Sequence, residues 1–203
     1  DYKKKTYSYG EVGRHILILH DIFRKRKIKQ ADKIAMIGAN SSNWAMVYLA
    51  TVTYGATVVP ILPEFHDEDI QHIVNHSESR ILFAAEEIAA TIDEEKLEKL
   101  TTVVSLDTLE LLSFKDKHLP EEVKATEEKA RDRVTGVTPE TFSLPPDREA
   151  DDLAALVYTS GTSGFSKGVM LPYRSLLANI NFARDNMRLD MTEKTLSFLP
   201  LAH

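Results

Sequence analysis

A strand, a helix and a second strand follow one another early in the sequence, and this unit constrains the fold more than any other segment. Residues 33 to 37 and 56 to 62 are apolar and strand-like. Between them, Ser41 or Ser42 is expected to cap a helix that ends at Gly55, since glycine enters the left-handed conformation of a helix C-terminus without steric cost. Such a unit predicts two parallel strands joined by a right-handed crossover.

Strand-like and helical segments keep alternating on both sides of this unit. Upstream, Ser8 and Glu11 indicate a capping box for an amphipathic helix that reaches about Phe23. Downstream, we expect a helix near 67 to 76, a strand at 80 to 85, a helix near 86 to 100 and a strand at 102 to 106. The economical fold is therefore α/β, a layered, parallel-rich sheet with flanking helices.

The composition changes between residues 115 and 152, where charged residues crowd one segment and prolines follow. This pattern favours a solvated charged helix and an extended linker over a partner-binding role for the charges. We therefore expect three parts: an α/β subdomain (1–114), the charged helix and proline-containing linker (115–152), and a phosphate-loop hairpin with a helix and the start of a further strand (153–203).

Residues 159 to 168 are rich in hydroxyl groups and glycine and contain one lysine. Glycines let successive backbone N–H groups converge on an anion, the hydroxyls add donors, and the lysine adds a positive charge. A plain polar hairpin turn is the alternative. The pattern favours a phosphate-binding loop with hydroxyls from Thr159, Ser160, Thr162 and Ser163, glycines at Gly161, Gly164 and Gly168, and the charge of Lys167.

The neighbours of this loop separate it from two common phosphate motifs. Apolar runs at 153 to 158 and 169 to 171 predict strands before and after it, and Pro172 ends the second strand before a helix that starts near Arg174. The Walker A loop and the dinucleotide-binding fingerprint both lead directly into a helix. The loop here joins two strands, so we expect it to hold phosphate through amides, hydroxyls and Lys167 without a helix dipole.

Charge and composition exclude several other classes. A net charge of −6 over 203 residues argues against nucleic acid or an anionic membrane as the main partner, and the absence of cysteine excludes disulfides and thiolate metal sites. The most apolar stretch, 45 to 62, is interrupted, so we expect a cytoplasmic protein whose membrane association is at most peripheral. His72 and His76 lack an evident third ligand, so we expect them to face solvent and predict no metal site.

Segments along the whole chain resemble the adenylate-forming superfamily, which includes acyl-CoA synthetases, luciferases and nonribosomal peptide adenylation domains. YTSGTSGFSKGVML (158–171) closely resembles its phosphate-loop signature, and LSFLPLAH (196–203) resembles the next motif of its long-chain fatty acyl-CoA synthetase branch. The N-terminal region of the family is similar to two further segments, TYSYGEV and NSSNWAMVYLATVTYGATVVPILP. The resemblance implies the partial N-terminal domain of an acyl-CoA synthetase-like fold.

The resemblance also implies a two-step ligase reaction. A fatty acid carboxylate attacks the α-phosphate of ATP to give acyl-adenylate and pyrophosphate, and CoA then takes the acyl group. By this likeness the loop residues from Thr159 to Gly164 and Lys167 would hold the ATP phosphates, and His203 would lie at the acyl and adenylate pocket. The implied partners are the small molecules ATP, fatty acid and CoA, together with Mg²⁺ whose glutamate ligand is expected beyond His203.

The chain departs from the family pattern in several respects. Ser166 replaces the usual proline before the loop lysine, and Pro172 and Tyr173 stand where relatives commonly have a hydroxyl residue and histidine. Relatives are also much longer, so we expect an N-terminal fragment without catalytic activity of its own. The alternatives left open are an acyl-carrier-protein ligase, an aryl-CoA ligase, and a non-catalytic nucleotide- or phosphate-binding α/β module complete in itself.

Overall fold

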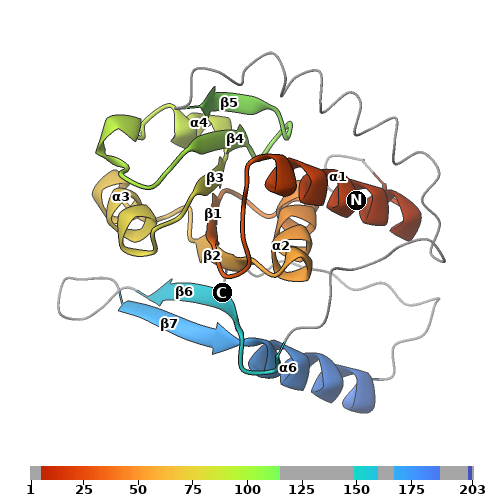
Figure 1. Ribbon diagram of the computed structural model, residues 1–203. Helices are drawn as coiled ribbons and strands as arrows, with labels where there is room; N and C mark the ends of the chain where they lie inside the picture. Colours follow the sequence, from red (N-terminus) through yellow and green to blue (C-terminus); the bar gives the residue numbers. More distant parts are fainter. Residues whose placement is uncertain (1–5, 115–148, 160–166, 188–200, 203) are drawn as a thin grey trace.

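The computed structural model describes residues 6–114, 149–159, 167–187 and 201–202, and their strands form one sheet in the order β5-β4-β3-β1-β2-β6-β7 (Figure 1). Five neighbouring strands, from β4 to β6, run parallel, whereas β5 and β7 pair antiparallel at the two edges. The expected parallel-rich α/β sheet is confirmed. The strand bounds are β1 Lys33–Ile37, β2 Thr57–Ile61, β3 Ile81–Ala84, β4 Thr102–Ser105, β5 Leu111–Phe114, β6 Leu153–Thr159 and β7 Lys167–Pro172.

The first two helices begin at the caps expected from the sequence, and the second also ends at the expected glycine. Ser8 and Glu11 form the capping box of α1. Ser41 caps α2 by accepting the Trp44 backbone N–H at 3.0 Å, and Gly55 ends α2 in the left-handed conformation at φ 88°. The helix bounds are α1 Tyr9–Lys25, α2 Ser42–Tyr54, α3 Asp67–His76, α4 Glu86–Ala89, the 3-10 helix η1 Glu94–Lys96 and α6 Tyr173–Asn186.

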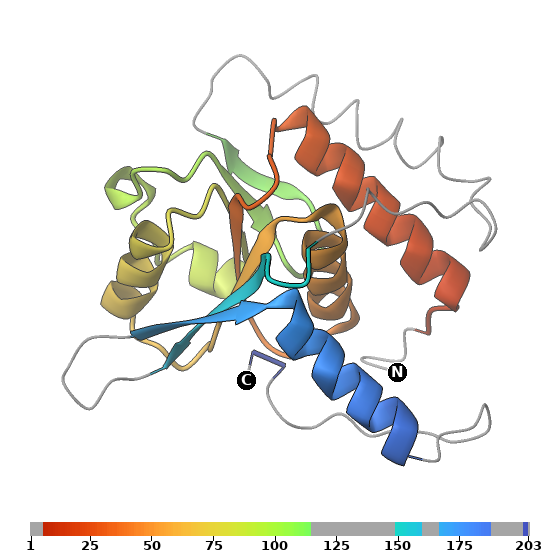
Figure 2. The same ribbon diagram turned by 60° about the horizontal axis from the view of Figure 1, so that its bottom comes forward.

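Helices cover both faces of the sheet, as Figure 2 shows. Helices α1 and α2 pack on one face, where Phe23 and Trp44 share a core with Met36. Helix α3 packs on the other face, where Ile73 shares a core with Ile37. Successive residues of a strand point to opposite faces, and both faces are buried, so the parallel strands appear in the sequence as continuous apolar runs.

The prediction of one helix near 86 to 100 was wrong, because the chain there forms only the short elements α4 and η1. The Thr91 hydroxyl donates to the Ile88 carbonyl, and the Asp93 carboxylate accepts the Glu95 backbone N–H at 3.2 Å. These local side-chain bonds compete with a continuous helix.

Strand β5 was not expected from the sequence. It has four residues and pairs antiparallel with β4 after a turn in which Leu109 adopts φ 61°. The turn lacks glycine and asparagine, the residues that normally mark such a conformation, so the sequence carries no hairpin signal there.

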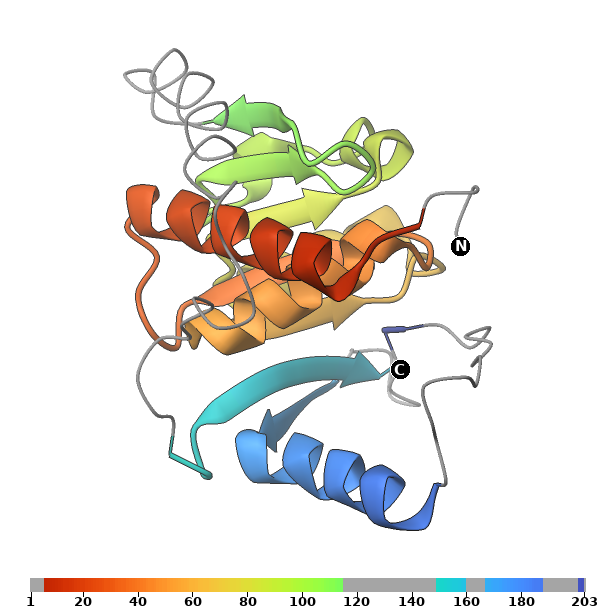
Figure 3. The ribbon, with the colours of Figure 1, turned by 90° about the vertical axis from the view of Figure 1, so that its right-hand side faces the viewer.

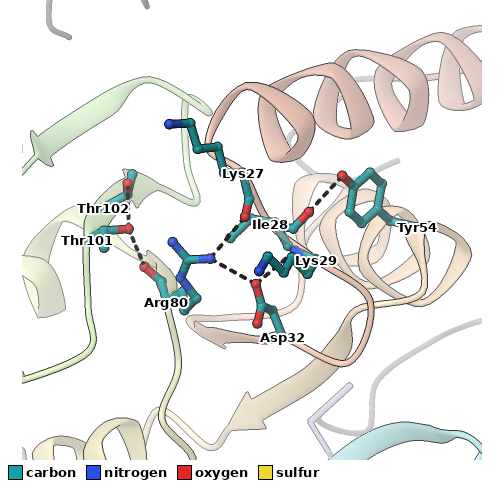
Figure 4. Close-up of polar contacts among 8 residues, drawn as sticks. All are labelled: Lys27, Ile28, Lys29, Asp32, Tyr54, Arg80, Thr101 and Thr102. Carbon is teal, nitrogen blue, oxygen red and sulfur yellow. Dashed lines mark hydrogen bonds and ion pairs between the residues drawn. The ribbon is translucent and has the colours of Figure 1, made fainter.

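A polar network joins the amino-terminal edge of the sheet (Figure 4). The Arg80 guanidinium, just before β3, donates to the Lys27 carbonyl and the Asp32 carboxylate, both at 3.0 Å. Asp32, just before β1, also accepts the Lys29 backbone N–H at 2.8 Å. The Thr101 hydroxyl donates to the Arg80 carbonyl at 2.9 Å and adds the start of β4. The side chains at this edge therefore link the amino-terminal ends of β1, β3 and β4.

Helix α6 and strand β7 expose several large apolar side chains. Figure 3 shows β6, β7 and α6 stacked at one end of the sheet, and none of the α6 residues is buried. Among the described helices, none combines the length and apolar character needed to span a bilayer. The exposed apolar side chains of β7, α6 and the residue after α6 are Val169, Met170, Leu177, Ile180, Phe182 and Met187.

His20 is a buried titratable group in the α1–α2 interface, and sequence analysis gave it no role. Its side chain is 3% exposed, and Nε2 lies 2.9 Å from the Ala50 carbonyl and 3.0 Å from the Thr53 hydroxyl. Burial lowers the pKa of His20 from 6.5 to about 4, with the Ala50 carbonyl acting in the opposite direction. The folded protein therefore holds this imidazole neutral under conditions in which the unfolded chain protonates it.

We predict that His20 makes the free energy of unfolding fall as pH falls from about 6.5 to about 4. The unfolded state binds a proton in this window and the folded state does not, so stability is lost there, by roughly 3 kcal/mol in all. Urea unfolding at several pH values should show a flatter profile for His20→Gln. The exposed His66→Gln variant should keep the wild-type profile, and equal slopes for His20→Gln and wild type would contradict this account.

A second prediction compares two glycines. Gly55→Ala should destabilise the protein by about 1–2 kcal/mol, because alanine is strained at φ 88°. Gly10→Ala is the matched control: a Cβ at Gly10, in the first turn of α1, would meet only Arg14 Nη1 at 4.0 Å. That change should be neutral or stabilising by up to ~1 kcal/mol. Thermal unfolding checks both signs, and similar effects at the two positions would contradict the backbone explanation.

Candidate functional site

The two ends of the predicted phosphate loop lie side by side on the β6–β7 hairpin. Thr159 is the last residue of β6, Lys167 is the first of β7, and the two are register partners. Both are solvent-exposed. The prediction that the loop joins two strands is confirmed. The other predicted ligands lie outside the described residues: Ser160, Gly161, Thr162, Ser163 and Gly164.

The pairing of β6 places this hairpin at the carboxyl-terminal edge of the sheet. Strand β6 runs parallel to β2, with Val58 opposite Ala155, and β2 runs parallel to β1. Figure 3 shows β6 running in the same direction as β2. Thr159, the last residue of β6, therefore lies at the same edge as the last residues of the other parallel strands. Ligands of α/β sheets bind outside this edge. The opposite edge holds the Arg80 network.

The usual ligand position of such a sheet is occupied by the chain itself. Crossovers leave β1 and β3 in opposite directions, so the topological switch point lies between their carboxyl ends. A Cβ at Gly38, just after β1, would lie 2.7 Å from Leu106 Cδ2 and 3.4 Å from Ala85 Cβ. The Asn43 amide donates to the Leu106 and Asp107 carbonyls at 3.0 and 2.8 Å. This closure leaves the β6 end as the better candidate.

A further segment reaches the same edge near the end of the chain. The Leu201 backbone N–H donates to Asn40 Oδ1 at 2.9 Å, and Ala202 is buried in the core formed with α1 and α2. Asn40 lies in the loop after β1, so residues next to His203 lie at the carboxyl-terminal edge. His203 itself lies outside the described residues. Sequence analysis noted Asn40 only within a family-like segment and missed this contact.

His76 has a specific partner that sequence analysis also missed. His72 and His76 are both exposed, as expected, and their ring centroids are 5.5 Å apart. His76 Nδ1, however, lies 2.6 Å from the hydroxyl of Tyr158, the residue before Thr159. Tyr158 is 3% exposed, and burial raises its pKa. Within the described ranges, no three metal-ligating side chains gather into a cluster.

Comparison with known proteins identifies the family. The profile of the AMP-binding enzyme family matches residues 1–203, so the chain belongs to that family. The sequence-based recognition of the adenylate-forming superfamily is thereby confirmed, and long-chain acyl-CoA synthetases are among the relatives.

Three comparisons illustrate the range of relatives. Long chain acyl-CoA synthetase 7, peroxisomal, of Arabidopsis thaliana is 25% identical over 97% of this chain and 28% of its own length. Carboxylic acid reductase of Mycobacterium marinum is 27% identical over 98% of this chain and 18% of its own length. The crystal structure of ATP-bound MatB from Rhodopseudomonas palustris has the same fold, with a TM-score of 0.72 and 23% identity over 98% of this chain and 36% of that chain. The chain thus spans at most about a third of these proteins.

The Asn40 contact leads to a test of the edge geometry. Asn40→Ala should remove the acceptor for the Leu201 N–H, a bond of about 0.5–1.5 kcal/mol, and so speed hydrogen exchange of that amide by about two- to tenfold. Asn40→Asp keeps an acceptor oxygen and should retain the protection. Equal exchange in wild type and Asn40→Ala would contradict the placement of residue 201.

Proposed function

We propose that this chain supplies the phosphate-binding side of the active site of an ATP-dependent ligase that activates a fatty acid through an acyl-adenylate. The supporting observation is the position of Thr159 and Lys167, which are register partners at the carboxyl-terminal edge of the sheet. These two residues begin and end a loop rich in hydroxyls and glycine. Family membership adds the adenylating chemistry, and the long-chain acyl-CoA synthetase relatives favour a fatty acid as substrate.

In the first step, a carboxylate oxygen of the acid forms a bond to the α-phosphorus of ATP. The bond from that phosphorus to the bridging oxygen breaks, and pyrophosphate leaves with the accumulated charge. The positive charge of Lys167 and the loop donors would stabilise this departing group, because phosphoryl transfer depends mainly on alignment and charge neutralisation. In the second step the CoA thiol attacks the acyl carbon, AMP leaves, and the thiol proton is released.

Mg²⁺ accompanies ATP in this proposal, but we assign no step to it in this chain. The described residues contain no group of three or more His, Asp or Glu side chains placed to bind a metal. The proposed contribution of the described residues is therefore electrostatic and positional, through Lys167 and Thr159. His203 remains a proposed residue of the acyl and adenylate pocket, and a cytoplasmic location remains a prediction.

A second candidate function is a nucleotide- or phosphate-binding module that is complete in itself. The two buried cores, one on each face of the sheet, favour an independently folded unit. Calorimetric titration of the 203-residue chain with Mg-ATP separates the two functions. The ligase proposal expects weak or no binding by the chain alone, since adenine and ribose contacts are expected elsewhere. Tight binding would favour the module.

We predict that Lys167→Ala impairs the use of ATP by the natural gene product that carries this sequence. Loss of a charge-assisted contact of ~1.5–3 kcal/mol should lower kcat/KM for ATP roughly ten- to a hundredfold in fatty acid-dependent pyrophosphate exchange. Lys99→Ala, at an exposed lysine before β4, should leave this value unchanged. An unchanged kcat/KM for Lys167→Ala would remove the role given to this lysine.

A further inference from the structure

Tyr158 occupies a constrained place just before the proposed phosphate-binding residues. Its register partner on β7 is Gly168, and a Cβ there would lie only 3.3 Å from Tyr158 Cζ and 3.0 Å from Leu156 Cδ1. The missing side chain at Gly168 therefore gives the Tyr158 ring its space across the hairpin. An aromatic ring that covers a glycine on a neighbouring strand fixes the pairing of the two strands.

The second constraint on Tyr158 comes from helix α3. The His76 and Tyr158 rings meet edge to face, with centroids 5.7 Å apart and an interplanar angle of 88°, and the imidazole Nδ1 and phenol oxygen are 2.6 Å apart. Helix α3 is itself fixed: Ile73 is fully buried, and the Asn75 side chain bonds the Lys96 carbonyl and the Glu98 N–H. His76 therefore extends from a rigid support.

The bond between His76 and Tyr158 orients the Tyr158 ring and adds little to the burial of its apolar surface. The Tyr158 ring is already enclosed by the core on the α3 face, so a phenylalanine would fill the same space. The hydroxyl adds a directional bond between α3 and the end of β6, across 82 positions of sequence. A buried hydroxyl without its partner is unfavourable, which ties the position of the ring to His76.

Thr159 follows Tyr158, and Lys167 precedes Gly168, so peptide bonds join both described ends of the loop to the cross-strand pair of Tyr158 and Gly168. We propose that His76 and Tyr158 form a positioning pair that sets where Thr159 and Lys167 stand at the carboxyl-terminal edge. This inference rests on the proposed phosphate-binding function of those two residues. Neither His76 nor Tyr158 is required to touch the nucleotide.

The test measures KM for ATP and KM for the fatty acid in pyrophosphate exchange by the natural gene product. His76→Ala and Tyr158→Phe should each raise KM for ATP by about two- to tenfold and leave KM for the acid unchanged. The double variant should be no worse than either single variant, because both remove one bond. His76→Asn offers an amide near the former Nδ1 and should restore KM to within about twofold of wild type. His66→Ala, at the other end of α3, is the control.

Four outcomes would overturn the positioning role. They are additive effects of the two substitutions, equal rises in both KM values, an unchanged KM for ATP, and failure of His76→Asn to restore the KM for ATP. Hydrogen exchange of β6 and β7 in the same proteins separates this inference from the proposed function. Faster exchange in His76→Ala and Tyr158→Phe, but not in His66→Ala, supports the positioning pair even if the wild-type protein makes no use of ATP. Unchanged exchange in that case would overturn the pair as well.

Discussion

Strand β6 joins the sheet by pairing in parallel with β2: Val58 lies opposite Ala155, and the Thr57 hydroxyl donates to the Leu153 carbonyl at 3.2 Å. The direction of this pairing decides where the loop after β6 can act. A parallel β6 places Thr159 at the carboxyl-terminal edge, and the antiparallel return of β7 brings Lys167 beside it. An antiparallel β6 would have sent the same residues to the edge that the Arg80 network occupies. The chemistry of the loop thus depends on one strand pairing between segments almost a hundred residues apart.

The closure at the β1 and β3 ends complements this arrangement. A doubly wound sheet offers its switch point as the default ligand site, but here Leu106 lies against Gly38, and Asn43 fixes the Leu106 carbonyl. The β6–β7 hairpin is therefore the candidate ligand site at this edge. Relatives that share this part of the chain carry names as different as acyl-CoA synthetase and carboxylic acid reductase. The proposed phosphate-binding role of this shared part, with the acceptor chemistry determined elsewhere, accounts for that spread.

Local chemistry made much of the fold predictable. The Ser8 capping box, the Ser41 cap and Gly55 act within a few residues of themselves, so the sequence displays them directly. The continuous apolar runs also predicted the parallel strands. Strand β5 and the break between α4 and η1 were not predicted. Strand β5 follows a turn without glycine or asparagine, and side-chain bonds to the backbone interrupt the helix. The contacts of His76 with Tyr158 and of Asn40 with Leu201 join positions 82 and 161 residues apart, and no spacing rule connects such pairs.

We propose that ATP phosphates bind at the β6–β7 hairpin. A crystal structure of the natural gene product with ATP and Mg²⁺ tests it most directly. We expect a phosphate oxygen within about 2.7–3.2 Å of Lys167 Nζ, with the phosphate chain beside Thr159 at the carboxyl-terminal edge. A nucleotide bound instead at the Gly38 and Leu106 end of β1 and β3, or bound without contact to Lys167, would contradict it.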